Sequence, residues 1–254
     1  MLLLVCGLFG LVVGSFLNVV VWRVPRGESI VSPGSHCPAC DAQLGPAENV
    51  PVLSWVIQRG RCRHCRAGIS ARYPLVELGT AGLWVGLAAR FGAAWELPAY
   101  LTLSAGLVAL SLIDLDHFLL PNKVLYPTGF LTGGLLLLPA AIDGQWDSYL
   151  RAVLGGAAAF AVFFVIHLIS PRGMGFGDVR LSFVLGLALG WLSWRLVYLG
   201  LFLGFLLGAV IGTLLIAVGR KTRKDHVPFG PFLAAGAMIA IYFGDPLLRL
   251  LHFN

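Results

Sequence analysis

Residues 196–218, LVYLGLFLGFLLGAVIGTLLIAV, decide the fold of this chain. The stretch contains no charged side chain, and as a helix it is long enough to cross the roughly 30 Å hydrocarbon core of a bilayer. Comparable apolar stretches recur along the whole chain. The sequence therefore predicts an all-α polytopic membrane protein with about eight transmembrane helices, at residues 2–22, 75–92, 97–115, 124–142, 152–169, 179–194, 196–218 and 229–251.

Composition supports a membrane protein and argues against other classes. Of the 254 residues, 58% are hydrophobic and only 12% are charged, and the mean hydropathy is +0.85. A soluble globular domain does not have this composition. The net charge of +6 is better explained by membrane topology than by nucleic-acid binding, which we do not expect.

The distribution of positive charge predicts the orientation. Arg23 and Arg26 follow the first span, and no positive residue precedes it, which is the pattern of an uncleaved anchor with its N-terminus outside. With this orientation, 14 of the 18 Lys and Arg residues lie on the cytoplasmic side, including Arg220, Lys221, Arg223 and Lys224. The four residues assigned to the outside are Arg90, Arg151, Arg195 and Arg249.

One hydrophilic insert, residues 23–74, separates the first two spans and carries two CxxC pairs. The pairs are Cys37 with Cys40 and Cys62 with Cys65, and 21 residues separate them. This spacing predicts a zinc-ribbon-like site with four cysteine ligands, which would be structural because it leaves no open coordination position. Two disulfides, four free thiols, or substitution by His36 or His64 are the alternatives. Cys6 lies in the first span and is interpreted as a small buried apolar residue.

Two aspartates at span ends are the candidate catalytic pair. Asp114 closes the third span and Asp178 follows Gly175-Phe176-Gly177 at the start of the sixth. Because the chain crosses the membrane twice between them, both should end on the cytoplasmic face. Two carboxylates that meet in a poorly solvated site share a proton, and such a pair can activate water against a peptide carbonyl. The glycines would allow a substrate backbone to approach.

Less specific interpretations of these acids remain open. Each aspartate could be an ordinary helix-end residue, and Asp178 is placed to cap the sixth span. Asp116 competes with Asp114 for the first catalytic role. The sequence has neither the HExxH pattern of zinc proteases nor the GxSxG pattern of serine hydrolases.

Three further polar residues are candidates for supporting roles. Glu77 is either part of a functional motif or an interfacial partner of Arg72. His117 could tune the aspartate pair or be solvated. His167 is interpreted as a hydrogen-bonded packing residue.

Taken together, these motifs resemble the type 4 prepilin peptidases over nearly the whole chain. The resemblance rests on several motifs in one order: Gly14-Ser15-Phe16-Leu17-Asn18 with Arg23 and Pro25, the two CxxC pairs, Asn49-Val50-Pro51-Val52-Leu53-Ser54-Trp55, Arg59-Gly60-Arg61-Cys62, Arg72-Tyr73-Pro74-Leu75-Val76-Glu77, Ile113-Asp114 with Pro121, and Gly175-Phe176-Gly177-Asp178.

The resemblance implies a bifunctional enzyme of the bacterial inner membrane. Such an enzyme cleaves the basic leader from prepilins or pseudopilins and then methylates the new N-terminus with S-adenosylmethionine. The family's catalytic aspartates correspond to Asp114 and Asp178, and Asp114 rather than Asp116 matches the pattern before Pro121. The implied organisation is a first transmembrane helix at 1–22, a cytoplasmic zinc insert at 23–74 and a transmembrane protease core at 75–254. No residues are assigned to methyl transfer, which the family associates with the insert.

Two other classes of function remain as alternatives. A transporter or channel with a zinc ribbon would place its carboxylates near the bilayer midplane and would show an internal repeat. A non-catalytic pilus assembly protein would bind pilin-like helices through glycine-rich spans. The position of both aspartates at span ends favours the enzyme over the transporter.

Overall fold

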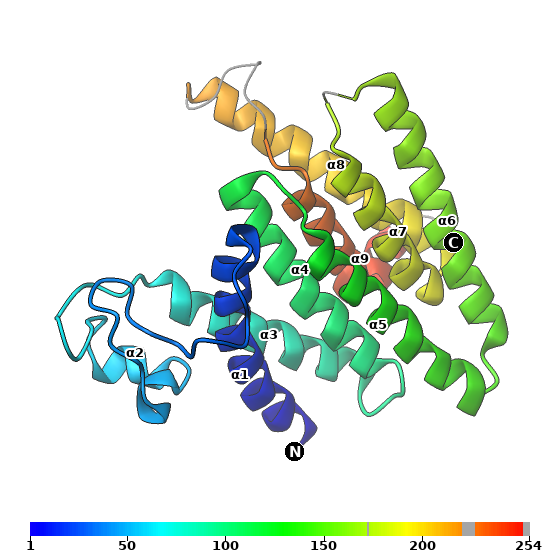
Figure 1. Cartoon of the computed structure of the whole chain (residues 1–254). Coiled ribbons are helices and arrows are strands. Elements are labelled where there is room, and N and C mark those ends of the chain that lie inside the picture. The colour runs from blue at the N-terminus through cyan, green and yellow to red at the C-terminus, as the bar shows by residue number, and fades with distance from the viewer. Residues whose placement is uncertain (172, 220–226, 251–254) are drawn as a thin grey trace. The chain divides into compact units, whose positions relative to one another are not determined.

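The computed structural model describes residues 1–171, 173–219 and 227–250. Within these ranges the regular structure is helical, with two isolated β-bridges in the insert. The order of elements along the chain (Figure 1) is α1 Leu2–Arg23, η1 Val24–Arg26, η2 Pro46–Asn49, α2 Leu53–Ile57, α3 Arg72–Phe91, α4 Leu97–His117, α5 Asn122–Ile142, α6 Trp146–Ile169, α7 Phe176–Leu192, α8 Trp194–Ala217 and α9 Gly230–Leu250.

Each of the eight predicted spans corresponds to a helix, and six of the described helices are long and apolar enough to cross a membrane. These six are α1, α4, α5, α6, α8 and α9. Helix α3 carries three charged residues, Arg72, Glu77 and Arg90, and α7 has only 17 residues, which corresponds to about 25 Å. The fold class is therefore confirmed, whereas the exact count of eight spans is not.

The chain divides into two compact units, Met1–Leu97 and Pro98–Asn254. In the first unit α1 packs along α3. A Cβ atom at Gly14 would lie 2.7 Å from the Cα atom of Glu77, so only glycine allows the two helices to approach this closely. Near the same end of the pair, the buried Asn18 donates hydrogen bonds to the carbonyls of Gly14, at 3.3 Å, and Tyr73, at 3.2 Å.

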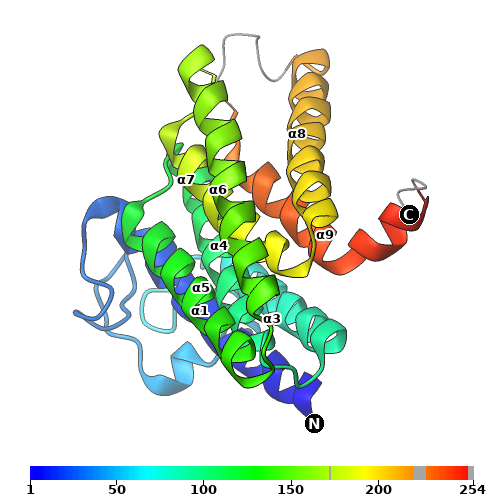
Figure 2. The same cartoon turned by 90° about the vertical axis from the view of Figure 1, so that its right-hand side faces the viewer.

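In the second unit α7 forms the core. It packs against α5, α6, α8 and α9, and Figure 2 shows it beside α6. A Cβ atom at Gly186 of α7 would lie 2.5 Å from the Gly155 carbonyl oxygen of α6. The buried Tyr100 of α4 donates a 2.7 Å hydrogen bond to the Ala188 carbonyl. Because other helices surround α7, it can be shorter than a lipid-facing span.

Arg151 of α6 caps the C-terminus of α7. Its guanidinium donates to the carbonyls of Gly190 at 2.8 Å, Trp191 at 2.6 Å and Leu192 at 3.3 Å. The last carbonyls of a helix have no partner within the helix and carry its partial negative charge. Arg151 was one of four basic residues that the predicted topology assigned to the outside, and these contacts give it a structural role.

We expect Arg151→Met to lower the free energy of unfolding by about 2 kcal/mol, because it leaves buried carbonyls without a charged donor. Thermal unfolding in detergent, followed by circular dichroism, would measure the change. Arg249→Met removes an exposed arginine from the last turn of α9 and is the control, with an expected change within about 0.5 kcal/mol. Equal effects of the two variants would contradict the capping role.

Candidate active site and metal centre

Asp114 lies in the last turn of α4 and is buried, with 5% of its surface exposed. Its Oδ2 atom accepts a 3.1 Å hydrogen bond from the backbone amide of Gly230, the first residue of α9. A helix N-terminus presents free amides and a partial positive charge, so it stabilises a carboxylate. A Cβ atom at Gly230 would lie 2.8 Å from the same oxygen, so glycine is required for this contact.

Asp178 has the same kind of environment at the N-terminus of α7. It is the third residue of the helix and is 8% exposed. Its Oδ2 atom accepts a 3.2 Å hydrogen bond from the Gly175 amide. The alternative that Asp178 caps its helix is therefore correct in geometry, and it does not exclude a chemical role, because the second carboxylate oxygen is not used by this bond.

The structure brings the two carboxylates together. Asp114 and Asp178 lie within electrostatic range of each other. Leu120, in the loop between α4 and α5, contacts both helix starts: it is 3.0 Å from a Cβ atom built at Gly177 and 3.1 Å from one built at Gly230. The ends of α4, α7 and α9 therefore meet at one site, and two acids 64 positions apart in the sequence face it.

The glycines before Asp178 allow close contacts within the protein. Leu120 occupies the space next to Gly177, and the Asp178 carboxylate lies 3.3 Å from a Cβ atom built at Gly175. The protein occupies only the side on which a Cβ atom would point, and Gly175 itself is exposed. The approach of a substrate backbone to these glycines therefore stays a prediction.

Asp116, which competes with Asp114, and the histidines His117 and His167 have environments that differ from that of the carboxylate pair. Asp116 and His117 are exposed, whereas Asp114 is buried, so the geometry favours Asp114. His167 lies with Nδ1 2.8 Å from the Met174 carbonyl oxygen. Because a carbonyl only accepts, Nδ1 carries the hydrogen here, and His167 is hydrogen-bonded as predicted. It holds the segment that leads into α7.

Arg180 and its neighbours were not identified from the sequence. Its guanidinium donates a 2.6 Å hydrogen bond to Asn122 Oδ1 at the start of α5. It also lies 4.5 Å from the centre of the Phe176 ring and 5.9 Å from that of Tyr126. These contacts tie the first turns of α7 to α5, next to Asp178. A lone arginine two residues after an aspartate gives no sequence signal of such a role.

In the first unit, the four cysteines of the insert converge. Their sulfur atoms all lie within 4.8 Å of one another, and the sulfurs of Cys37 and Cys65 are 3.8 Å apart. Four ligands at the usual Zn–S distance of about 2.3 Å around a tetrahedral ion would be about 3.8 Å apart. All four cysteines are free thiols rather than disulfides. The cluster therefore fits a zinc ion.

The two CxxC turns are structural copies of each other. In the first, the Cys37 amide donates to the Ala42 carbonyl and the Asp41 amide donates to the Cys37 carbonyl, both at 2.9 Å. The second repeats this pattern with Cys62, Ala67 and Arg66, at 2.8 and 3.0 Å. Asp41 and Arg66 occupy the same left-handed position, with φ of 55° and 61°. Two equivalent knuckles, each presenting two sulfurs, are the architecture of a zinc ribbon.

The thiol chemistry also favours a cation. The backbone amides of Cys65 and His64 stabilise the Cys62 thiolate and lower its pKa from 9.0 to about 6. Although the Ala42 amide favours a thiolate at Cys40, burial and the adjoining Cys65 and Cys37 sulfurs raise its pKa to about 12. Without a metal, ionisation of a second cysteine in the cluster is therefore unfavourable once Cys62 is a thiolate. A divalent cation would allow all four sulfurs to ionise.

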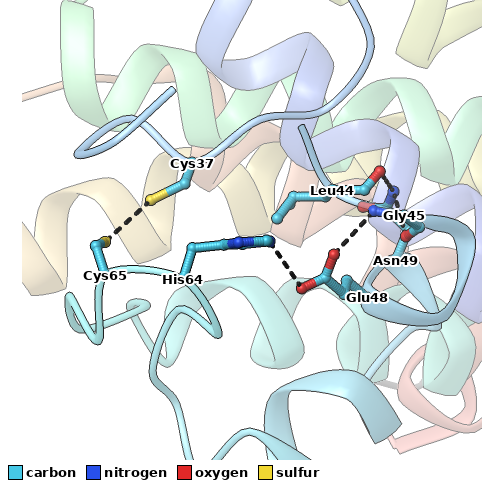
Figure 3. A network of polar contacts seen from close by, with 7 residues as sticks. All are labelled: Cys37, Leu44, Gly45, Glu48, Asn49, His64 and Cys65. Carbon is cyan, nitrogen blue, oxygen red and sulfur yellow. Dashed lines mark hydrogen bonds and ion pairs between the residues drawn. The ribbon is translucent and has the colours of Figure 1, made fainter. Parts of the chain in front are cut away.

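The histidines of the insert lie outside this sulfur cluster. Figure 3 shows His64 directed at Glu48, with 3.8 Å between Nε2 and Oε1. The other oxygen of Glu48 accepts a 2.9 Å hydrogen bond from the Gly45 amide. His36 Nδ1 lies 3.2 Å from the Gly34 carbonyl. The four-cysteine set is therefore favoured over one that includes a histidine.

Glu77 joins the insert to α3. It is buried, and its Oε2 atom accepts a 2.7 Å hydrogen bond from the backbone amide of Val52. Val52 has a φ of 61°, which is unfavourable for a β-branched residue. The carboxylate of Glu77 thus holds a strained backbone position immediately before α2. The sequence left the role of Glu77 open between a motif and an interfacial residue.

These features define a multi-pass membrane protein with a paired-carboxylate site at helix ends and a four-cysteine insert. Residues 8–91 match the bacterial Peptidase A24 N-terminal domain, and residues 101–213 match the type IV leader peptidase family. The chain belongs to this family, as the resemblance predicted.

Three relatives, each named prepilin leader peptidase/N-methyltransferase, match nearly the full length. The protein of Pseudomonas aeruginosa is 37% identical, over 95% of this chain and 90% of its own. That of Stutzerimonas stutzeri is 35% identical, over 94% and 89% respectively. That of Bacillus subtilis is 36% identical, over 95% and 94%. No solved structure matches the chain significantly.

Proposed function

We propose that this protein cleaves the basic leader from type IV prepilins or pseudopilins and then methylates the new N-terminus. Family membership and the names of the relatives support this activity. The observation that carries the proteolytic step is the meeting of two buried carboxylates, each held by one backbone amide at a helix N-terminus. The transporter alternative placed such acids near the bilayer midplane, whereas both lie within one turn of a helix end.

In the proposed reaction the two aspartates share one proton. The ionised carboxylate takes a proton from water as the water oxygen attacks the scissile carbonyl carbon, and the protonated carboxyl donates its proton to the carbonyl oxygen. The C–N bond then breaks: the leaving amine receives the proton taken from water, and one hydroxyl of the diol returns its proton to the other carboxylate, which restores the shared proton. The amides of Gly230 and Gly175 orient the two carboxylates, so that one oxygen of each is fixed and the other is left for this chemistry.

The two cofactors have different roles in this proposal. Zinc held by Cys37, Cys40, Cys62 and Cys65 would be structural, because four sulfur ligands leave no position for water. S-adenosylmethionine would supply the methyl group, as the names of the relatives suggest. The residues that bind it stay unassigned.

The proposed location is the bacterial inner membrane, with the N-terminus outside and both aspartates at the cytoplasmic face. A basic leader stays on the cytoplasmic side while the apolar segment behind it enters the bilayer, so its scissile bond would lie at this face. Part of the charge argument for this orientation rests on Arg172, Arg220, Lys221, Arg223 and Lys224, which lie outside the described residues.

Incubation of the purified protein with a prepilin tests both activities at once. Mass spectrometry should show loss of the leader, and addition of S-adenosylmethionine should then add one methyl group to the new N-terminus. A prepilin that stays intact with correctly folded protein would refute the proteolytic function and favour a non-catalytic assembly protein.

We expect Arg180→Met to lower the rate of leader release by roughly tenfold, because the first turn of α7 loses a charged hydrogen bond. The substrate KM should change little, since Arg180 acts through the position of Asp178. Arg180→Lys should recover much of the rate, and Asn122→Ala should add little to Arg180→Met. Lys123→Met, which removes the exposed cation next to Asn122, is the control. A loss confined to KM would instead indicate direct contact with the substrate.

A further inference from the structure

Positive charge is concentrated on the second CxxC knuckle and is not balanced locally. No acidic residue occurs between Glu48 and Glu77, and both of these acids accept backbone hydrogen bonds. The knuckle carries four exposed arginines, Arg59, Arg61, Arg63 and Arg66. The first knuckle has no arginine and carries Asp41 at the position equivalent to Arg66. The zinc-ribbon architecture therefore does not require these arginines, because the first knuckle has the same backbone pattern without them.

An apolar face adjoins these arginines. Helix α2 exposes Leu53, Val56 and Ile57, and Ile57 is 70% exposed. At spacings of three and four residues they lie on one side of the helix. Trp55 fixes α2 to the knuckle, because its Nε1 donates a 3.0 Å hydrogen bond to the Ile69 carbonyl and its own carbonyl accepts a 2.9 Å bond from the Gly60 amide. The apolar face and the arginines are thus parts of one rigid body.

The start of this body is fixed beside the C-terminal part of α1. The Val52 amide, immediately before α2, is bonded to Glu77, and Glu77 packs against Gly14 of α1. Gly14 lies nine residues, or about 14 Å, before the end of α1 at Arg23. At that end of α1 the Arg26 guanidinium lies 3.6 Å from the centre of the Trp22 ring. A tryptophan and an arginine at the end of a span are typical of a membrane-interface anchor. The start of α2 therefore lies beside the last turns of a membrane-spanning helix.

We propose that this surface, made of Leu53, Val56, Ile57 and the four arginines of the second knuckle, docks on anionic lipid headgroups. The apolar side chains enter the interface and the arginines bind phosphates, as in interfacial helices with a basic flank. The charge excludes the proposed substrate leader as the occupant, because that leader is also basic. The proposal concerns membrane contact and does not depend on proteolytic activity.

Hydrogen exchange of the full-length, zinc-loaded protein in lipid nanodiscs tests the proposal. We expect the amides of residues 53–66 to exchange at least roughly tenfold more slowly in phosphatidylglycerol than in phosphatidylcholine, since each arginine near an anionic surface contributes about fivefold to binding. High ionic strength should reduce the difference, because salt screens exposed charges. Replacing Arg59, Arg61, Arg63 and Arg66 by Gln should abolish it, and replacing them by Lys should largely keep it.

The matched control replaces Arg220, Lys221, Arg223 and Lys224 by Gln, which removes the same charge from another segment and should leave the lipid effect intact. Zinc content, measured on every variant, shows whether the knuckle is still folded. Equal exchange in the two lipids would overturn the proposal. Protection that appears only when a prepilin is added, or only when two copies associate, would also overturn it and would assign the surface to a protein partner.

Discussion

Asp114→Asn and Asp178→Asn are each expected to lower the rate of leader release by roughly a thousandfold or more. The substitution keeps the size of the side chain and its ability to accept the Gly230 or Gly175 amide, but it removes the group that gains and loses a proton. If the two carboxylates act as a unit, the double variant should be no worse than either single one. Mass spectrometry of released leader, from detergent-solubilised enzyme at matched protein level, measures the effect.

Two controls separate this chemistry from misfolding. Asp116→Asn changes an exposed acid two residues from Asp114 and should keep substantial cleavage. Methylation of an already cleaved substrate should persist in all the Asn variants, because methyl transfer does not need the carboxylate pair. Normal release by Asp178→Asn would refute the aspartic-protease mechanism. Normal release by Asp114→Asn together with loss in Asp116→Asn would move the first catalytic role to Asp116.

The helices could be predicted well because a lipid environment places a simple requirement on the sequence of a membrane span. A long apolar stretch must be helical in a membrane, and charged, glycine and proline residues mark its ends. Helix α7 shows where this rule is insufficient. Its 17 residues are enclosed by other helices, so its length reflects packing around it rather than the thickness of the bilayer.

The aspartates could be paired from the sequence, but their environment could not. Counting membrane crossings places Asp114 and Asp178 on one face without any knowledge of packing. The amide that binds Asp114 belongs to Gly230, 116 residues away, and no local pattern connects the two. The same holds for Arg151, which appeared as an exception to the charge rule until its contacts with the end of α7 were known.

The four-cysteine cluster could be predicted because CxxC is a local motif whose turn geometry aims both sulfurs at one point. The two knuckles are also similar in sequence, CPACDAQL at 37–44 and CRHCRAGI at 62–69. Equivalent positions of the two segments make the same backbone hydrogen bonds. The contact between Glu77 and Val52 was not predictable. It depends on a backbone conformation of positive φ at a valine, which propensities disfavour.

Cys62→Ser is expected to remove zinc from the protein and to unfold the insert. Structural zinc sites contribute apparent binding free energies of about 10–16 kcal/mol, so a small domain built around one does not fold without it. The region between the knuckles has only the short helices η2 and α2, of four and five residues, and a few hydrogen bonds to α3 and the second knuckle. Methylation, which the family associates with the insert, should be lost, whereas measurable cleavage should survive because Asp114 and Asp178 lie in the other unit.

Metal analysis, limited proteolysis of residues 23–74 and a methylation assay on cleaved substrate would measure these three effects. His64→Ala removes a neighbour of the cluster whose ring faces Glu48 rather than the sulfurs, so this variant should keep its zinc. Cys6→Ser, a buried thiol in α1, controls for general effects of losing a cysteine. Wild-type protein that is active in both reactions and contains no zinc would contradict the structural role. Zinc loss with an intact insert and full methylation would show that the knuckles fold on their own hydrogen bonds.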